Sequence, residues 1–215
     1  MNGLISNAEA TNPRGSSRRS FLSGLILGGA SGALAAALAF RARSSNSKQE
    51  GNRPVTDLSE AFRTLDHQRF MREAIARAKN VPDLPFGAVI VLAERAEIVA
   101  DGFNRSKLNP TYHGEVDAIN RCAESQPEID WNGLVLYTTA EPCPMCQSAV
   151  EWAGIRMVVF GSSIPFLKSL GFWQIDIRAE EVARRTPFHH CALLGGVLEK
   201  ECDALFLATG RKPVK

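Results

Sequence analysis

Residues 134–161 read LVLYTTAEPCPMCQSAVEWAGIRMVVFG, and their pattern predicts a strand, a helix and a second strand in succession. The apolar, partly β-branched run 134–139 suits a buried strand, and 157–161 is a second such run. Between them, residues 143–153 have the length of a helix, with Pro144 in its first turn, where no backbone N–H is needed. Two strands joined through a helix favour parallel pairing in one sheet.

The segments on either side continue this alternation of helices and strands. Residues 67–79 have apolar side chains at helical spacing, and 86–91 and 98–100 predict a hairpin with a turn at 94–96. Further helices are expected at 114–123, 179–186 and 198–209, and a last short strand at 193–197. The pattern therefore predicts an α/β fold, with a partly parallel sheet covered by helices on both faces.

Composition limits the class of partner. Hydrophobic residues make up 45% of the 215 residues, which is enough to fill a core, and the formal net charge is +2. Residues 1–39 hold three arginines and one acid, so the rest of the chain carries 22 basic and 22 acidic residues. Because basic and acidic residues are equal in number, the rest of the chain lacks the excess of positive charge that is typical of nucleic-acid-binding proteins. Nucleic acid is therefore the disfavoured partner.

The N-terminus resembles a twin-arginine export signal. Arg18-Arg19 is followed by Phe21-Leu22 and a weakly apolar, Gly-rich run that ends in Ala37-Leu38-Ala39. We therefore divide the chain into a signal peptide (1–39), a flexible linker (40–60) and a folded domain (61–215). The resemblance implies recognition by the twin-arginine translocase and a periplasmic or extracytoplasmic location. An uncleaved membrane anchor is the alternative, because about 20 apolar residues can span a bilayer.

Five cysteines are too few and too unevenly spaced for a disulfide-stapled framework. Cys143 and Cys146 form a metal-type pair. The others, Cys122, Cys191 and Cys202, are best interpreted as buried small apolar residues, although the sequence leaves their redox state open.

Two motifs at predicted helix starts combine into a zinc site. His113-Gly114-Glu115 begins one helix, and Cys143 follows His113 by 30 residues at the start of the next. Cysteines three apart on a helix lie on one face, close enough for both thiolates to bind one metal ion. The helix dipoles would stabilise the thiolates. The sequence therefore predicts that His113, Cys143 and Cys146 lie close together, with Glu115 beside them.

The pattern HxE followed by PCxxC resembles the zinc-dependent cytidine and guanine deaminase superfamily. The resemblance runs from about residue 66 to 206 and includes Phe86-Gly87-Ala88-Val89, Asn104, Leu136-Tyr137-Thr138-Thr139, Glu141-Pro142 and Trp152. It implies a three-layer αβα domain with a five-stranded mixed sheet. It also implies that His113, Cys143 and Cys146 bind zinc, with water in the fourth position, and that Glu115 is the catalytic proton shuttle.

The resemblance further assigns substrate contacts to Asn104, Gly114 and Trp152. Two of these have a simpler interpretation: Asn104 could cap a turn, and Trp152 could be a core or interface aromatic. A closed structural zinc site is the alternative to a catalytic one. Its fourth ligand would come from His67, His189, His190, Cys122, Cys191 or Cys202.

The resemblance implies a zinc-dependent hydrolase that releases ammonia from a nucleobase or nucleoside, with a guanine-type purine preferred. Cytosine is the runner-up because HGE is similar to fungal-type cytosine deaminases. The C-terminal pattern is similar to tRNA adenosine deaminases, and a non-catalytic zinc protein that binds a heterocycle is a further alternative. The resemblance also implies a homodimer, which nothing in the residues indicates independently.

Overall fold

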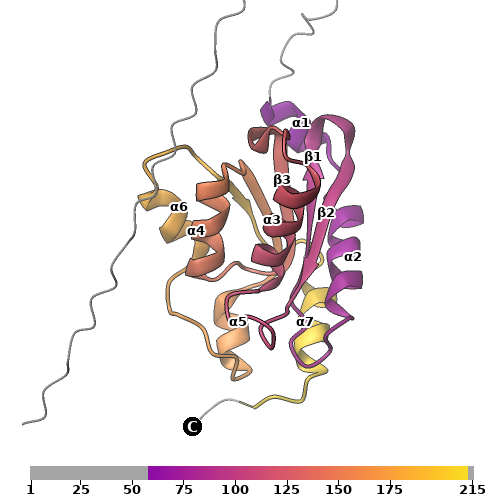
Figure 1. Ribbon diagram of the computed structural model, residues 1–215. Helices are drawn as coiled ribbons and strands as arrows, with labels where there is room; N and C mark the ends of the chain where they lie inside the picture. Colours follow the sequence, from indigo (N-terminus) through magenta and orange to yellow (C-terminus); the bar gives the residue numbers. More distant parts are fainter. Residues whose placement is uncertain (1–57, 213–215) are drawn as a thin grey trace, which may run out of the picture. The chain divides into compact units, whose positions relative to one another are not determined.

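The computed structural model in Figure 1 describes residues 58–212. The predicted signal peptide, 1–39, and residues 40–57 of the predicted linker lie outside the described residues. Residues 58–60, which the sequence assigned to the linker, lie in the first helix, α1 (Leu58–Thr64).

One five-stranded mixed sheet forms the centre of the domain. Its strands are β1 (Gly87–Leu92), β2 (Glu97–Phe103), β3 (Leu134–Ala140), β4 (Met157–Ser162) and β5 (Ala192–Leu194), in the spatial order β2-β1-β3-β4-β5. Strand β1 pairs antiparallel with β2 and β3, whereas β3, β4 and β5 are parallel. This confirms the predicted mixed sheet.

Helices cover both faces of the sheet, as the buried strands require (Figure 1). One face packs against α2 (His67–Ala78) and α7 (Glu199–Leu207), and the other against α3 (Gly114–Ser125) and α4 (Pro144–Ala153). The short helices α5 (Ile164–Ser169) and α6 (Ala179–Arg185) lie between β4 and β5 in the chain, and α6 packs on α4. The predicted αβα architecture is therefore confirmed.

The core explains why these elements form. All seven residues of β3 are buried, because both of its faces carry helices and both of its edges carry strands. Alternate residues serve opposite faces: Val135 and Tyr137 belong to the cluster with α2, whereas Leu134 and Leu136 belong to the cluster with α3 and α4.

Two further local features also differ from the predictions. Helix α5 was missed because it has only six residues, although Ser163 caps it and Pro165 lies in its first turn. Strand β5 ends at Leu194, earlier than expected, because Gly196 turns the chain with a positive φ of 80°. Among the described helices, none is long and apolar enough to cross a bilayer.

Candidate metal and active site

The site lies where α3 and α4 begin, near the carboxyl end of β3. Helix α4 begins after β3 ends, and α3 ends before β3 begins. Both helices therefore start at the end of the sheet where β3 terminates. His113 and Cys143 are the N-cap residues of α3 and α4, and neither side chain caps its own helix. Both side chains are therefore free to project beyond the helix ends.

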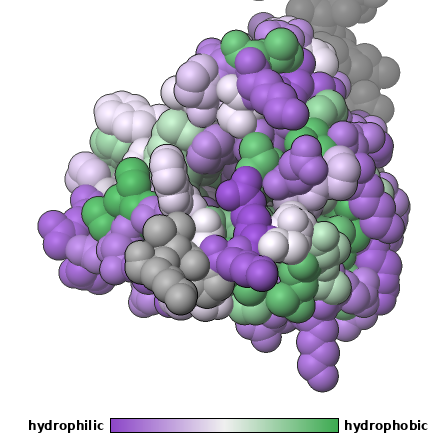
Figure 2. All heavy atoms as spheres, turned by 90° about the horizontal axis from the view of Figure 1, so that it is seen from below, coloured by the Kyte–Doolittle hydropathy of each residue, from purple (hydrophilic) through white to green (hydrophobic). Residues whose placement is uncertain are grey.

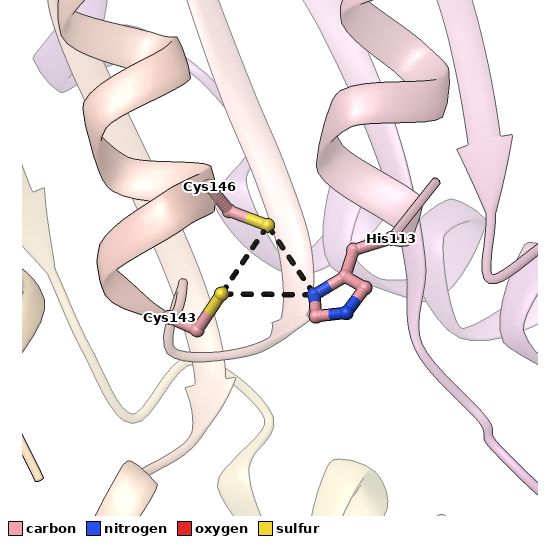
Figure 3. A group of neighbouring side chains, drawn as sticks. All are labelled: His113, Cys143 and Cys146. Atoms are coloured by element: carbon pink, nitrogen blue, oxygen red, sulfur yellow. Dashed lines mark hydrogen bonds between the residues drawn. The ribbon is translucent and has the colours of Figure 1, made fainter. Parts of the chain in front are cut away.

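Figure 3 shows His113, Cys143 and Cys146 turned toward one another. The two Sγ atoms are 3.6 Å apart, and His113 Nδ1 is 3.6 Å from Cys143 Sγ and 3.5 Å from Cys146 Sγ. Tetrahedral zinc, with its usual bond lengths to sulfur and nitrogen, separates two sulfurs by about 3.8 Å and a sulfur from a nitrogen by about 3.6 Å. These donor atoms therefore fit zinc.

The three side chains also shift one another's pKa values. Hydrogen bonds from Cys146 and then from His113 lower the pKa of the Cys143 thiol to about 4, although burial opposes this. The hydrogen bond to Cys143 and burial raise the pKa of Cys146 well above its usual value, and the bond to Cys143 raises that of His113. Metal binding requires thiolates and a neutral imidazole, so a divalent cation would displace the protons that these groups carry.

The site has three protein ligands. In residues 58–212, the only group of three or more metal-type side chains close enough to share an ion is His113, Cys143 and Cys146. None of the fourth ligands considered for a closed site joins them. Three ligands leave one position for water, as catalytic zinc requires.

Glu115 lies beside this triad in the first turn of α3. Its side chain is 3% exposed, and Thr138 Oγ1 on β3 donates a hydrogen bond to Oε1 at 3.2 Å. Burial, and then the nearby charge of Cys143, raise the pKa of Glu115. A carboxyl group with a raised pKa can both accept and return a proton near neutral pH.

A cavity of about 240 Å³ opens onto His113, Glu115 and Cys143. Its other lining residues are Leu84, Phe86, Asn104, Ser106, Glu141, Phe172, Trp173, Gln174 and Arg211. Figure 2 views this end of the domain from below Figure 1, and hydrophilic residues cross its centre between hydrophobic ones. The cavity is smaller than the roughly 300–1,000 Å³ of typical ligand pockets, so it suits a small heterocycle.

Asn104 lines this cavity and also organises a turn. Its Oδ1 accepts hydrogen bonds from the backbone N–H and the hydroxyl of Ser106, at 3.0 and 2.7 Å. Because Oδ1 is occupied, the side-chain orientation is fixed, and Nδ2 has no partner among the described residues. The turn-capping role and the predicted substrate contact are therefore compatible.

Gly114 lies outside the residues that line the cavity. A Cβ atom at this position would lie 2.8 Å from the carbonyl oxygen of Phe86, so the glycine lets α3 approach the start of β1. Its described role is close packing of the backbone.

Trp152 does not lie at the cavity. It is 76% exposed and packs against Phe188, with ring centroids 4.5 Å apart. It lies six positions after Cys146 on α4, which places it about 9 Å further along the helix axis and on a different side of the helix. The predicted substrate contact therefore has no support in this structure, and the homodimer implied by the resemblance stays a prediction.

Sequence reasoning missed Asp117, a fully buried carboxylate on α3. It accepts hydrogen bonds from Arg105 and from the backbone N–H of Phe103 at 3.3 Å, and it forms an ion pair with Arg121 at 3.3 Å. These contacts tie the segment that carries Asn104 to the helix that carries Glu115. The pattern His-Gly-Glu-Val-Asp gives no signal for this role, because the partners are remote in sequence.

We expect Asp117→Asn to lower the free energy of unfolding by about 3 kcal/mol, since it leaves buried donors and charges without their partner. Urea unfolding of the zinc-loaded protein measures the loss. The matched control is Asp83→Asn, an exposed aspartate whose replacement should change stability by less than about 0.5 kcal/mol. Equal stability of the two variants would contradict the prediction.

A hydrolytic zinc enzyme needs an open coordination position on the metal and a carboxyl group nearby. The fold and the site therefore place the chain in the class of hydrolytic zinc enzymes. Residues 64–162 match the family model of the cytidine and deoxycytidylate deaminase zinc-binding region. The chain belongs to this family of zinc-dependent hydrolytic deaminases.

Known relatives of the chain differ in substrate. It is 33% identical over 141 residues to guanine deaminase of Bacillus subtilis (strain 168), covering 60% of this chain and 88% of that protein. It is 31% identical over 148 residues to the tRNA-specific adenosine deaminase of the same strain, covering 66% and 88%. The crystal structure of a mutant protein in complex with 8-azaguanine shares the fold, with a TM-score of 0.60 and 22% identity. The match covers 76% of this chain and 97% of that protein.

Proposed function

We propose that this enzyme hydrolyses the exocyclic amino group of a free purine base, with guanine as the preferred substrate. The observation that carries the proposal is the Glu115 carboxyl group, buried beside the three metal ligands on a cavity of about 240 Å³. This volume favours a base over a larger nucleotide or a folded RNA. The relationship to guanine deaminase supports the same choice.

Zinc held by His113, Cys143 and Cys146 would lower the pKa of water toward about 7 and so supply the nucleophile. Glu115 accepts a proton from the attacking water and passes it to the ring nitrogen next to the amine-bearing carbon. It then transfers the proton of the new hydroxyl group to the amine, which leaves as ammonia while the carbonyl forms, so one water is consumed for each ammonia released. Thr138 orients the carboxyl group through its hydrogen bond.

The cavity walls offer a heterocycle both stacking surfaces and hydrogen-bond donors. Phe86 and Phe172 meet edge to face, with centroids 5.8 Å apart, and the Arg211 guanidinium carbon lies 4.6 Å from the Phe172 ring centroid. Arg211 has no ion pair among the described residues. With Asn104 Nδ2 it supplies donors for the carbonyl and ring-nitrogen acceptors of a base such as guanine.

The test is ammonia release by zinc-loaded protein supplied with guanine, adenine, cytosine, their nucleosides or a tRNA. Turnover of guanine above the others supports the proposal. Preference for cytosine or for tRNA would establish one of the alternative substrates instead. Zinc at one per chain with heterocycle binding but no ammonia would indicate a non-catalytic binding protein.

We also propose that the enzyme acts outside the cytoplasm after export by the twin-arginine translocase. The support is the order of Arg18-Arg19, Phe21-Leu22 and the Gly-rich apolar run in the sequence. Such a route carries folded proteins, so zinc would be loaded before export.

We expect deletion of Arg18 and Arg19 to retain the protein in the cytoplasm of a host that has this translocase. Immunoblots of periplasmic and cytoplasmic fractions measure the distribution. Deletion of Arg41 and Arg43, which lie beyond the apolar run, is the control for loss of two positive charges. An unchanged periplasmic amount after deletion of Arg18 and Arg19 would rule out this route.

A further inference from the structure

Glu141 is a buried carboxylate that the chemistry above does not use. It is 3% exposed, and three N–H groups donate hydrogen bonds to its carboxylate. The backbone N–H of Ile164 donates to Oε2 at 3.0 Å, and that of Ala179 donates to Oε1 at 3.0 Å. Arg178 Nε lies 2.7 Å from Oε1 and 2.8 Å from Oε2. The cost of burying this charge is therefore offset by a complete set of donors.

The two backbone donors lie at the ends of one segment of the cavity wall. Ile164 is the first residue of α5 and Ala179 is the first residue of α6. The chain between these helices carries Phe172, Trp173 and Gln174, which line the cavity. One carboxylate thus anchors this wall on both sides.

Glu141 also belongs to the turn that carries a metal ligand. Its backbone N–H donates to the carbonyl of Ser162 at 2.7 Å, which fixes it at the carboxyl ends of β3 and β4. Only Pro142 separates it from Cys143, and its own side chain reaches the cavity. A single side chain therefore links the metal-binding turn to the segment of the cavity wall between α5 and α6.

We propose that Glu141 is a positioning residue that holds the wall 170–178 against the metal-binding turn, and so sets substrate affinity. The inference rests on the proposed function, since it assigns the wall to substrate binding. A residue that served only stability would leave KM unchanged when replaced. A residue that served the metal would change the zinc content.

The test compares zinc-loaded full-length wild type with Glu141→Gln. Glutamine keeps the size of the side chain but loses the charge and one of the acceptor oxygens. Hydrogen bonds to charged groups are strong enough that we expect about tenfold faster amide exchange at Ile164, Ala179 and the wall. We also expect KM to rise about tenfold for the best substrate, with kcat changed less than about threefold and zinc retained at one per chain.

Two further variants sharpen the result. Arg178→Ala removes one partner of the carboxylate at a half-exposed position, so it should give the same changes to a smaller degree, even if Glu141→Gln folds poorly. Glu180→Gln, an exposed acid on α6, is the control and should change neither exchange nor KM.

Amide exchange and zinc content test the inference independently of turnover. Unchanged exchange of the wall in both Glu141→Gln and Arg178→Ala would overturn it, as would loss of zinc with the wall still protected. If wild type releases no ammonia from any substrate, the proposed function fails, and the exchange data still decide whether Glu141 holds the wall. Faster exchange with unchanged KM would show that the wall does not set affinity, and so would also overturn the inference.

Discussion

Replacement of Glu115 by glutamine is expected to lower kcat by about 10²–10⁴-fold while one zinc per chain remains bound. Glutamine keeps the shape of the side chain and an oxygen that can accept from Thr138, but it cannot take up and return a proton. Zinc remains because Glu115 is outside the group of three ligands. Ammonia release and metal analysis of the same sample measure both effects.

The control is Glu124→Gln, which makes the same substitution at an exposed position near the other end of α3. Its turnover should equal that of wild type. Turnover of Glu115→Gln at more than about one tenth of the wild-type rate would show that another group moves the proton.

Removal of a metal ligand should have the second large effect. We expect Cys146→Ala to bind zinc at least about 100-fold more weakly, since loss even of a group that supports a ligand costs about 10–100-fold. Purified protein should contain little zinc and release no ammonia. Because bound metal stabilises the folded state, the variant should also unfold at a lower temperature than wild type.

The matched control is Cys122→Ala, which removes a fully buried thiol from α3 outside the metal-binding group. It should keep one zinc per chain and wild-type turnover, although it loses some packing. A chelator should lower the unfolding temperature of wild type and of Cys122→Ala but not that of Cys146→Ala. Full zinc content in Cys146→Ala would contradict the assigned ligand set.

The elements that the sequence predicted best are those whose burial follows a simple period. In α2, Phe70, Met71, Ala74, Ile75 and Ala78 are the buried residues, and they recur at helical spacing. The ends of elements were less predictable. Strand β5 ends early because of a glycine turn, and α5 is too short for a periodic pattern to show.

The metal site was predictable because its chemistry depends on local spacing. Cys143 and Cys146 share a helix turn, and His113 and Glu115 share another, so each pair is positioned by its own helix start. Trp152 shows the limit of this reasoning. It lies on the same helix as the cysteines, yet the geometry of α4 turns it away from the cavity.

The sequence by itself predicted the class of fold and the two motifs, His113-Gly114-Glu115 and Cys143 with Cys146, because periodic burial and the spacing within each motif are local properties of the chain. The tertiary structure brings His113, Cys143 and Cys146 together as one group. Only the tertiary structure decided which residues enclose the cavity and how they are held. Glu141, Phe172 and Arg211 meet there from separate segments. Their meeting depends on the packing of the sheet and its helices, and no local pattern encodes contacts between residues so far apart in the chain.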